Sequence, residues 1–231
     1  MKKVKIASIK KIPSKGMRYD IEVEGNCNFY ANGVLVHNSS ITHTQMPIEE
    51  EEEGINTLDE KFQGFNVCSR NMLLKRPVGD PNSAFWRATI ENDIEKYIFN
   101  GMAIQSELIG PSIQGNPHKL DATDMRVFNI MSIAPNVPAE RWSLEDMKSY
   151  CESVELQMVD IIFEGKFEDL GCETVEDFVE LANKAKYKTS KGEVQAEGIV
   201  VRLCEPEPHP RMGKELSFKV ISPKYALKHG E

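Results

Sequence analysis

The sequence lacks a paired cysteine motif, a long apolar run and an internal repeat. Its five cysteines include no Cys-x-x-Cys pair and are odd in number, which argues against a disulfide framework or a zinc site. No stretch reaches the roughly 18 apolar residues that a membrane-spanning helix needs. The basic segment Met1–Lys5 precedes no long apolar stretch, so it is a poor signal peptide. We therefore expect an intracellular, cytoplasmic protein, of cellular or phage origin, with free thiols and no membrane partner.

Negative charge dominates the chain but is unevenly distributed. The net charge is −8, yet residues 1–38 carry seven Lys/Arg and three Asp/Glu, whereas the remainder carries 21 and 33. Five of the acidic residues form the run Glu49–Glu53, which we expect to be a solvated loop. An acidic body argues against nucleic-acid binding by bulk charge alone, but it leaves room for a local basic surface.

The first 38 residues have the pattern of a small all-β unit. Tyr19–Val23 alternates apolar and charged residues, as a half-buried strand does. Asn32-Gly33 lies between Phe29-Tyr30 and Val34–Val36, which predicts a tight hairpin. A fragment of this size cannot bury enough surface to fold well alone, so its length already implies a missing partner.

The rest of the chain mixes helical and strand patterns. We expect one helix over 82–99, with Ile90, Ile94, Tyr97 and Ile98 on one side, and others starting at Ser143 and Thr174. The helical spacing after Ser143 continues to Ile161. Strands are expected at Ala103–Leu108, Met125–Ile133, Gly198–Leu203 and Leu216–Ser222. The pattern predicts an α+β fold of antiparallel sheets flanked by helices.

His37-Asn38-Ser39 has the side chains needed to break a peptide bond. The Asn38 amide can attack its own main-chain carbonyl, and His37 can assist because its pKa lies near neutrality. The Ser39 hydroxyl can accept an acyl group from an upstream segment. The three residues alone would more often be an ordinary turn, so the assignment depends on the residues around them.

Those neighbours resemble the two C-terminal blocks of inteins. The resemblance covers residues 18–39 and implies a Hint-type fragment at 1–38, with Asp20 assisting the proton transfers of splicing. Cys27 stands where many inteins have histidine. The length fits the C-terminal piece of a split intein, whose partner would be a separate N-terminal intein fragment. A gene truncated in assembly is the alternative.

Three segments after residue 63 carry a second resemblance: Gly64–Asn71, Ala103–Asn116 and Met125–Ile130. They resemble segments of the RNA ligase 2-like group of nick-sealing RNA ligases. The resemblance implies that Arg70 lies near the AMP phosphate or the RNA end, that Glu107 binds the ribose hydroxyls, and that Phe128 stacks on adenine. A surface arginine, a solvated edge carboxylate and a core phenylalanine are the ordinary alternatives.

Two later segments resemble motifs IV and V of the same group. In Ala196–Arg202 the resemblance assigns Glu197 to a divalent metal, Mg²⁺ or Mn²⁺, and in Ser217–Ser222 it assigns Lys219 to the α-phosphate of ATP. Either could instead be a solvated charge beside a buried strand. The implied domain at 39–231 is an ATP-grasp-like nucleotidyltransferase that binds RNA.

The nucleophile motif of this group, Lys-x-Asp-Gly, is absent from the sequence. Ser39–Thr42 resembles its continuation, so we expect splicing between Asn38 and Ser39 to join an upstream segment that carries the lysine. The product would be an ATP-dependent RNA ligase that seals 3′-hydroxyl and 5′-phosphate ends. A non-catalytic remnant that binds only nucleotide or RNA, and a DNA ligase or capping-type enzyme, are the alternatives.

Overall fold

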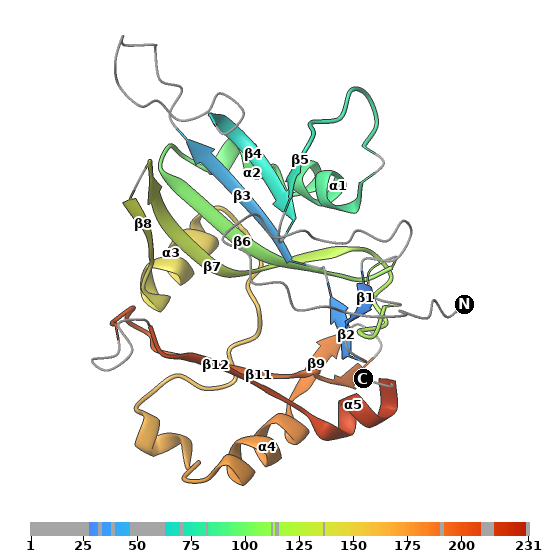
Figure 1. Cartoon of the computed structure of the whole chain (residues 1–231), viewed down its shortest axis with the longest axis vertical. Coiled ribbons are helices and arrows are strands. Elements are labelled where there is room, and N and C mark those ends of the chain that lie inside the picture. The colour runs from blue at the N-terminus through green and yellow to red at the C-terminus, as the bar shows by residue number, and fades with distance from the viewer. Residues whose placement is uncertain are drawn as a thin grey trace, which may run out of the picture.

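A computed structural model of the chain is drawn in Figure 1. It describes the following residues: 28–31, 34–37, 40–46, 63–69, 72–81, 83–111, 113, 116–135, 137–189, 192–208 and 215–229. The strand expected at Tyr19–Val23 and the acidic run Glu49–Glu53 lie outside them. In the N-terminal part, β1 (Asn28–Ala31) pairs antiparallel with β2 (Val34–His37), which confirms the hairpin predicted around Asn32-Gly33.

The larger part of the fold is built on a six-stranded antiparallel sheet. Its strand order is β5 (Leu73–Leu74), β4 (Gly64–Ser69), β3 (Ser40–Met46), β6 (Met102–Ile109), β7 (Asp124–Ala134) and β8 (Val137–Arg141). The central pairings put Ser40 opposite Glu107 and Glu107 opposite Arg126. The strands predicted at Ala103–Leu108 and Met125–Ile133 are therefore confirmed as β6 and β7.

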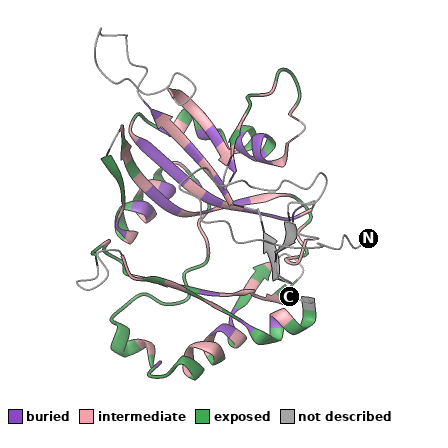
Figure 2. Cartoon of the chain, in the orientation of Figure 1, coloured by how far each residue is buried: buried purple, intermediate pink, exposed green. Residues whose placement is uncertain are grey.

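Three helices cover one face of this sheet (Figure 1): α1 (Ala84–Glu91), α2 (Ile94–Tyr97) and α3 (Leu144–Ser153). Alternate residues of the strands, such as Ile41, Val67 and Ile104, are fully buried against them. The buried residues concentrate in the central strands and the inner helix faces (Figure 2). The main core thus occupies one face of the sheet and leaves the other available for polar side chains.

The expectation of one helix over 82–99 is wrong at its centre. The chain forms two helices because Asp93 adopts the left-handed conformation, with φ of 49°, between α1 and α2. The break turns Ile90 outward, where it is 53% exposed, while Ile94 and Ile98 are buried. Helix α3 begins at its Ser143 cap as predicted, but it ends at Ser153 rather than continuing toward Ile161.

A second, smaller layer lies beside the uncovered face of the large sheet (Figure 1). It contains the elements η2 (Phe167–Leu170), α4 (Val175–Lys184), β9 (Lys186–Thr189), β10 (Gly192–Gln195), β11 (Gly198–Arg202), β12 (Ser217–Ile221) and α5 (Pro223–His229). Helix α4 has the capping box predicted at Thr174, and its Ala182 packs with Ile199 and Val220 of the β11–β12 pair. Both strands predicted after residue 197 are thus confirmed.

The helices that the structure describes include none long and apolar enough to cross a membrane.

Candidate nucleotide site

The uncovered face of the large sheet carries a row of polar side chains. Ser40 Oγ donates a hydrogen bond of 3.2 Å to Glu107 Oε2, across the β3–β6 pair. Gln105 Nε2 lies 3.5 Å from Thr42 Oγ1 on the same two strands. The two-residue period of β6 explains the arrangement, because Ile104 and Leu108 take the alternate positions in the core. Glu107 therefore lies on the face of β6 opposite the core residues Ile104 and Leu108.

Phe128 lies at an irregularity in the β6–β7 pairing. Gln105 pairs with Asn129 and Ser106 with Val127, so Phe128 is the extra residue of a β-bulge. Bulges change the direction of a side chain and are common beside active sites. Asn129 Nδ2 donates to Gln105 Oε1 at 2.8 Å and fixes the strand after the bulge. Phe128 itself is half-buried.

The β11–β12 pair presents a charged face away from α4. Ile199 and Val220 pack with α4, so the alternate residues, among them Val200, Arg202 and Lys219, take the opposite face. Lys219 Nζ lies 2.5 Å from Glu197 Oε1, and the two side chains are 50% and 28% exposed. The pair therefore forms at the surface of this layer, where a ligand can reach both charges.

Glu197 is held in place by the tight approach of the two strands. A Cβ atom on Gly198 would lie 2.1 Å from the Val220 carbonyl oxygen, so only glycine fits there. A hydrogen bond also fixes the backbone of Glu197: Ser222 N donates to the Glu197 carbonyl oxygen at 2.8 Å. Glu197 thus supplies its carboxylate directly before Gly198, the position where only glycine fits.

Arg202 connects the small layer to the large sheet. Its Nη1 donates a hydrogen bond of 3.0 Å to the Phe128 carbonyl oxygen, and its guanidinium carbon lies 5.5 Å from the Phe128 ring centroid. Burial lowers the pKa of Arg202, the positive charge of Arg141 lowers it further, and Glu215 opposes both. Arg202 nevertheless stays protonated near neutrality, because an arginine pKa starts so high.

A second connection joins the loop after β6 to β9. The His118 and Tyr187 ring centroids are 4.4 Å apart. Burial lowers the pKa of His118, while the negative charge of Glu197 opposes the shift. Gly110 allows the loop to close, since a Cβ there would lie 2.5 Å from the Ala122 carbonyl oxygen. This loop therefore lies close to the Glu197–Lys219 pair.

Four of the residues predicted from the sequence lie outside the described part of the chain: Asp20, Asn38, Ser39 and Arg70. His37 is the last residue of β2. Glu107 and Phe128 lie on the large sheet, and Glu197 and Lys219 lie on the small layer. Sequence reasoning assigned no role to Arg202, although its alternation with Gly198 and Val200 could have placed it on the same face.

Glu197 and its neighbours could hold a divalent metal ion together with the phosphate oxygens of a bound nucleotide, but not by themselves. The described residues contain no group of three His, Cys, Asp or Glu side chains placed to bind an ion. Glu197 offers a single carboxylate beside a lysine. Mg²⁺ is commonly held by one or two carboxylates together with phosphate oxygens and water, which matches this donor set.

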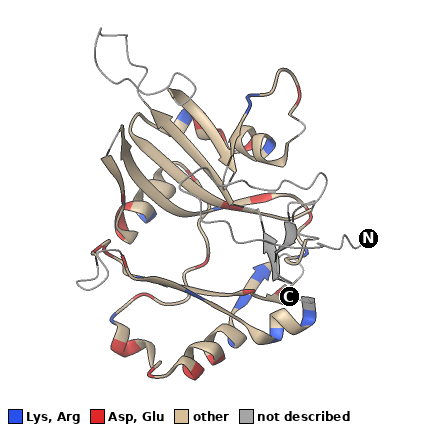
Figure 3. Ribbon diagram, in the orientation of Figure 1, with Lys and Arg blue, Asp and Glu red and all other residues tan. Residues whose placement is uncertain are grey.

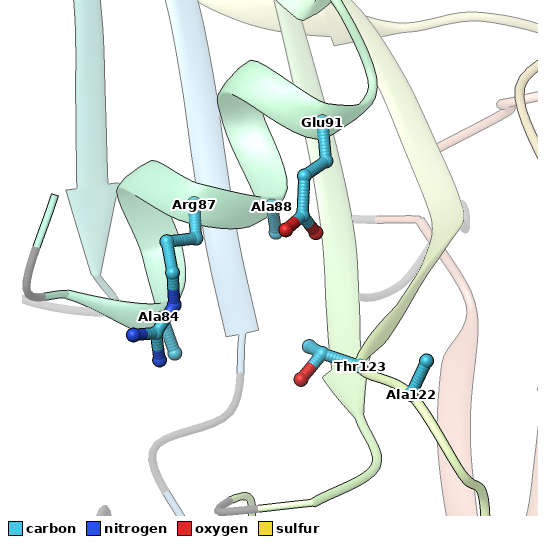
Figure 4. A pocket seen from close by; sticks show the side chains of 6 residues that line it. All are labelled: Ala84, Arg87, Ala88, Glu91, Ala122 and Thr123. Atoms are coloured by element: carbon cyan, nitrogen blue, oxygen red, sulfur yellow. The ribbon is translucent and has the colours of Figure 1, made fainter. Parts of the chain in front are cut away.

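A small hollow lies elsewhere, between α1 and the segment before β7 (Figure 4). It has a volume of about 110 Å³ and is lined by Ala84, Arg87, Ala88, Glu91, Ala122 and Thr123. None of the residues predicted from the sequence lines it. It is therefore separate from the polar row on the uncovered face.

Solved structures of an RNA ligase from Naegleria gruberi share this fold. A mutant with ATP and Mn matches with a TM-score of 0.61 and 24% identity, over 84% of this chain and 50% of that chain. A second mutant with ATP and Mn gives a TM-score of 0.60 and 24% identity, over 84% and 49%. A third, with AMP and Mn, gives a TM-score of 0.59 and 23% identity over 84% and 49%. The chain spans about half the length of these ligases.

The sequence itself is similar to a short segment of a DNA polymerase and to a family model of RNA ligases. A 49-residue stretch, 21% of the chain, is 45% identical to 3% of a DNA polymerase from Thermococcus aggregans. That segment is far too short a share of the polymerase to indicate a shared activity. The RNA ligase family model matches residues 26–221, which is most of the sequence. The chain belongs to the RNA ligase family.

Proposed function

We propose that this chain provides the nucleotide-binding and metal-binding side chains of an ATP-dependent RNA ligase. The observation that carries the proposal is the Glu197–Lys219 pair, joined through Arg202 to the strand that carries Phe128. Carboxylate, ammonium, aromatic ring and guanidinium thus come from both layers to one region. These are the groups that an adenylate-forming site needs for ribose, phosphate and base.

The resemblance to RNA ligases assigns each side chain a role that its chemistry can perform. Glu107 would accept hydrogen bonds from the ribose hydroxyls, and Phe128 would stack on adenine. Lys219 would place its ammonium against the α-phosphate and stabilise the charge that develops there. A divalent ion at Glu197 would neutralise further negative charge on the phosphates. The ion pair between Lys219 and Glu197 holds both charged groups in this region.

The reaction would need a lysine nucleophile that the chain does not carry in a Lys-x-Asp-Gly motif. That lysine would form a bond to the α-phosphorus of ATP while the bond to pyrophosphate breaks. An RNA 5′-phosphate would then take the AMP, and a 3′-hydroxyl would attack the activated end and release AMP. Lys219 would bind the same phosphate throughout, so its loss should stop the first step.

We further propose that protein splicing at Asn38–Ser39 supplies the missing lysine. The support is the intein-like sequence of residues 18–39, the β1–β2 hairpin that ends at His37, and the position of the junction. The junction directly precedes β3, whose first residue, Ser40, hydrogen-bonds Glu107. The family model begins at residue 26, so it gives no boundary at 38.

The register of β3 supports this choice of junction. Ser40 pairs with Glu107, and the pairing is antiparallel, so residues joined before Ser39 would continue β3 past Glu107 along β6. A Lys-x-Asp-Gly segment joined directly before Ser39 would therefore extend β3, which pairs with the strand that carries Glu107. The lysine would arrive at the Glu107 end of the sheet, on the side where a nucleotide is proposed to bind.

The test of the ligase proposal is labelling by radioactive ATP. The chain is co-expressed with an N-terminal intein fragment preceded by a ligase segment that contains Lys-x-Asp-Gly, and the joined protein is incubated with ATP and Mg²⁺. We expect covalent AMP labelling, lost in Lys219→Ala and retained in Lys75→Ala, an exposed lysine of the large layer. Undiminished labelling of Lys219→Ala would contradict the phosphate role.

Splicing is tested separately by intact mass. Wild type should yield a joined product that ends at Glu231 and a released 38-residue fragment, and Asn38→Ala should prevent that release. Normal excision in Asn38→Ala would remove Asn38 from the mechanism. A protein that neither splices nor labels, but binds nucleotide, would be a non-catalytic remnant. Sealing of nicked DNA in preference to RNA would instead favour the DNA ligase alternative.

A further inference from the structure

The small layer separates its charges onto two sides (Figure 3). Figure 3 shows acidic segments along η2 and α4 and basic segments on β9 and α5. The exposed acidic residues of the first side are Glu168, Asp169, Glu173, Glu176 and Glu180. The second side, here called the basic edge, consists of Lys186, Lys188, Lys224 and Lys228, all exposed. A polyanion would be repelled by the first side and attracted to the second.

The lysines of the basic edge have no carboxylate partners among the described residues. By contrast, three other lysines of the chain are paired: Lys148 with Glu164, Lys184 with Glu180, and Lys219 with Glu197. The strand β9 contains no acidic residue, and neither does α5. Glu193 pairs across from Lys188 in the backbone register but forms no ion pair with it. Apart from Glu193 opposite Lys188, the positive charge on this edge therefore has no acidic residue on its own elements, in a chain of net charge −8.

The two elements of the basic edge are fixed side by side. Ser222 Oγ donates to Asn183 Oδ1 at 2.7 Å, and Lys224 N donates to the same oxygen at 3.3 Å. Asn183 lies in the last turn of α4, three residues before Lys186. The start of α5 is thus bound to the last turn of α4, which directly precedes β9. Lys186 and Lys188 share one strand face about 6.6 Å apart, since a strand rises about 3.3 Å per residue.

The basic edge is next to the proposed nucleotide site. The residue between its two strand lysines, Tyr187, points to the opposite face and contacts His118, whose pKa responds to the charge of Glu197. Strand β12, which pairs with β11, carries Lys219 and runs directly into α5. A nucleic acid lying along the basic edge would therefore have one end near Glu197 and Lys219.

We propose that the basic edge binds the phosphate backbone of the RNA whose end is joined at the nucleotide site. The inference rests on the proposed ligase function and names the surface that holds its substrate. Binding would be electrostatic and independent of base sequence, because lysine ammonium groups contact phosphates as point charges. It would also resolve how a protein with an acidic body engages RNA.

The experiment measures binding of the 231-residue chain to a fluorescein-labelled nicked RNA duplex by anisotropy, over a series of salt concentrations. Lys186→Gln/Lys188→Gln should weaken binding and reduce the slope of log affinity against log salt by about two, or about one per lost phosphate contact. Lys224→Gln/Lys228→Gln should act in the same direction. Lys186→Arg/Lys188→Arg should bind like wild type, which separates charge from folding.

A matched control removes two charges elsewhere. Lys75 and Lys166 are exposed and have no ion pair among the described residues, so Lys75→Gln/Lys166→Gln changes net charge equally. Unchanged RNA affinity in the edge variants, or an equal loss in the control, would overturn the proposal. Failure of AMP labelling in the joined protein, with binding still dependent on the edge, would instead contradict only the ligase function.

Discussion

Arg202 holds Phe128 from two directions, through a 3.0 Å hydrogen bond to its carbonyl oxygen and through a guanidinium 5.5 Å from its ring centroid. The two residues are far apart in sequence and belong to different layers. Because Phe128 lies at a β-bulge, its backbone is less constrained by the sheet pairing than its neighbours are. Arg202 supplies the constraint that the ladder lacks, so the orientation of the ring depends on it.

Arg202→Lys should lower ATP affinity of the chain about tenfold, which corresponds to about 1.4 kcal/mol. Lysine keeps the charge but loses the planar fork and much of the ring contact. Calorimetric titration with ATP measures the effect, and Phe128→Ala should show a loss that is not additive with it. Arg87→Lys, on the exposed face of α1, is the control. Wild-type affinity in Arg202→Lys, with a loss in Phe128→Ala, would contradict the coupling.

Glu197→Gln should make ATP binding insensitive to divalent metal. The substitution keeps the shape but removes the charge that the proposal assigns to the ion. Calorimetric titrations with ATP should give different affinities in Mg²⁺ and in EDTA for wild type. For Glu197→Gln the two affinities should be the same.

The control for this prediction is Glu180→Gln, which breaks a comparable lysine pair on α4, 2.6 Å in length. The metal dependence of ATP binding in Glu180→Gln should remain that of wild type, because Glu180 is not among the residues proposed to bind the metal or the nucleotide. A metal response that survives in Glu197→Gln would place the ion elsewhere.

Acid should destabilise the large layer through His43. This residue is fully buried, and burial lowers its pKa from 6.5 to about 3. Thr89 Oγ1 donates to the Phe85 carbonyl oxygen, so it accepts from His43 Nε2 at 2.8 Å. The remaining His43 Nδ1 is buried without a partner among the described residues. A second proton would therefore create a buried charge with no acceptor.

The direction of this pH dependence of stability follows from the lowered pKa of His43. The unfolded chain binds a proton near pH 6.5 and the folded chain does not, so this contribution is complete above that pH and is lost as the pH falls toward 3. The loss should approach about 1.4 kcal/mol per pH unit within this window. Urea unfolding at several pH values measures it, with His43→Gln as the variant that cannot titrate. An equal pH slope in both proteins would assign the acid sensitivity to other groups.

Strand periodicity made the site-bearing strands predictable, whereas the contacts between layers were not. Alternation alone places Glu107 opposite the core residue Ile104 on β6, and Lys219 opposite Val220 on β12. No local pattern could indicate that Arg202 reaches Phe128, because that contact depends on how the two layers pack. The family resemblance indicated the roles of these residues, and the two-residue period of the strands indicated the sheet face on which each side chain lies.

The break in the expected helix shows a different limit. Asp93 in the left-handed conformation separates α1 from α2, although every residue from 84 to 97 tolerates a helix. Helix propensity differs by only fractions of a kcal/mol among such residues, so packing decides. The buried Ile94 and Ile98 reach the core only after the change of direction, which leaves Ile90 in solvent.

Two tyrosines allow a matched test of the contact between the layers. The Tyr187 hydroxyl is buried without a hydrogen-bond partner among the described residues, beside the His118 ring. The Tyr150 hydroxyl, by contrast, donates to the Tyr97 carbonyl oxygen at 2.5 Å. Burial raises the pKa of both, that of Tyr150 to about 12, so both hydroxyls are protonated near neutrality.

Replacing each tyrosine by phenylalanine should therefore have different effects. Tyr187→Phe should leave the free energy of unfolding unchanged or raise it, because it removes a polar group that is desolvated without compensation. Tyr150→Phe should lower it by about 1 kcal/mol, because a hydrogen bond is lost and a carbonyl is left unpaired. Urea unfolding of the two variants measures the contrast. A loss in Tyr187→Phe as large as that in Tyr150→Phe would mean that the Tyr187 hydroxyl has a partner that contributes to joining the layers.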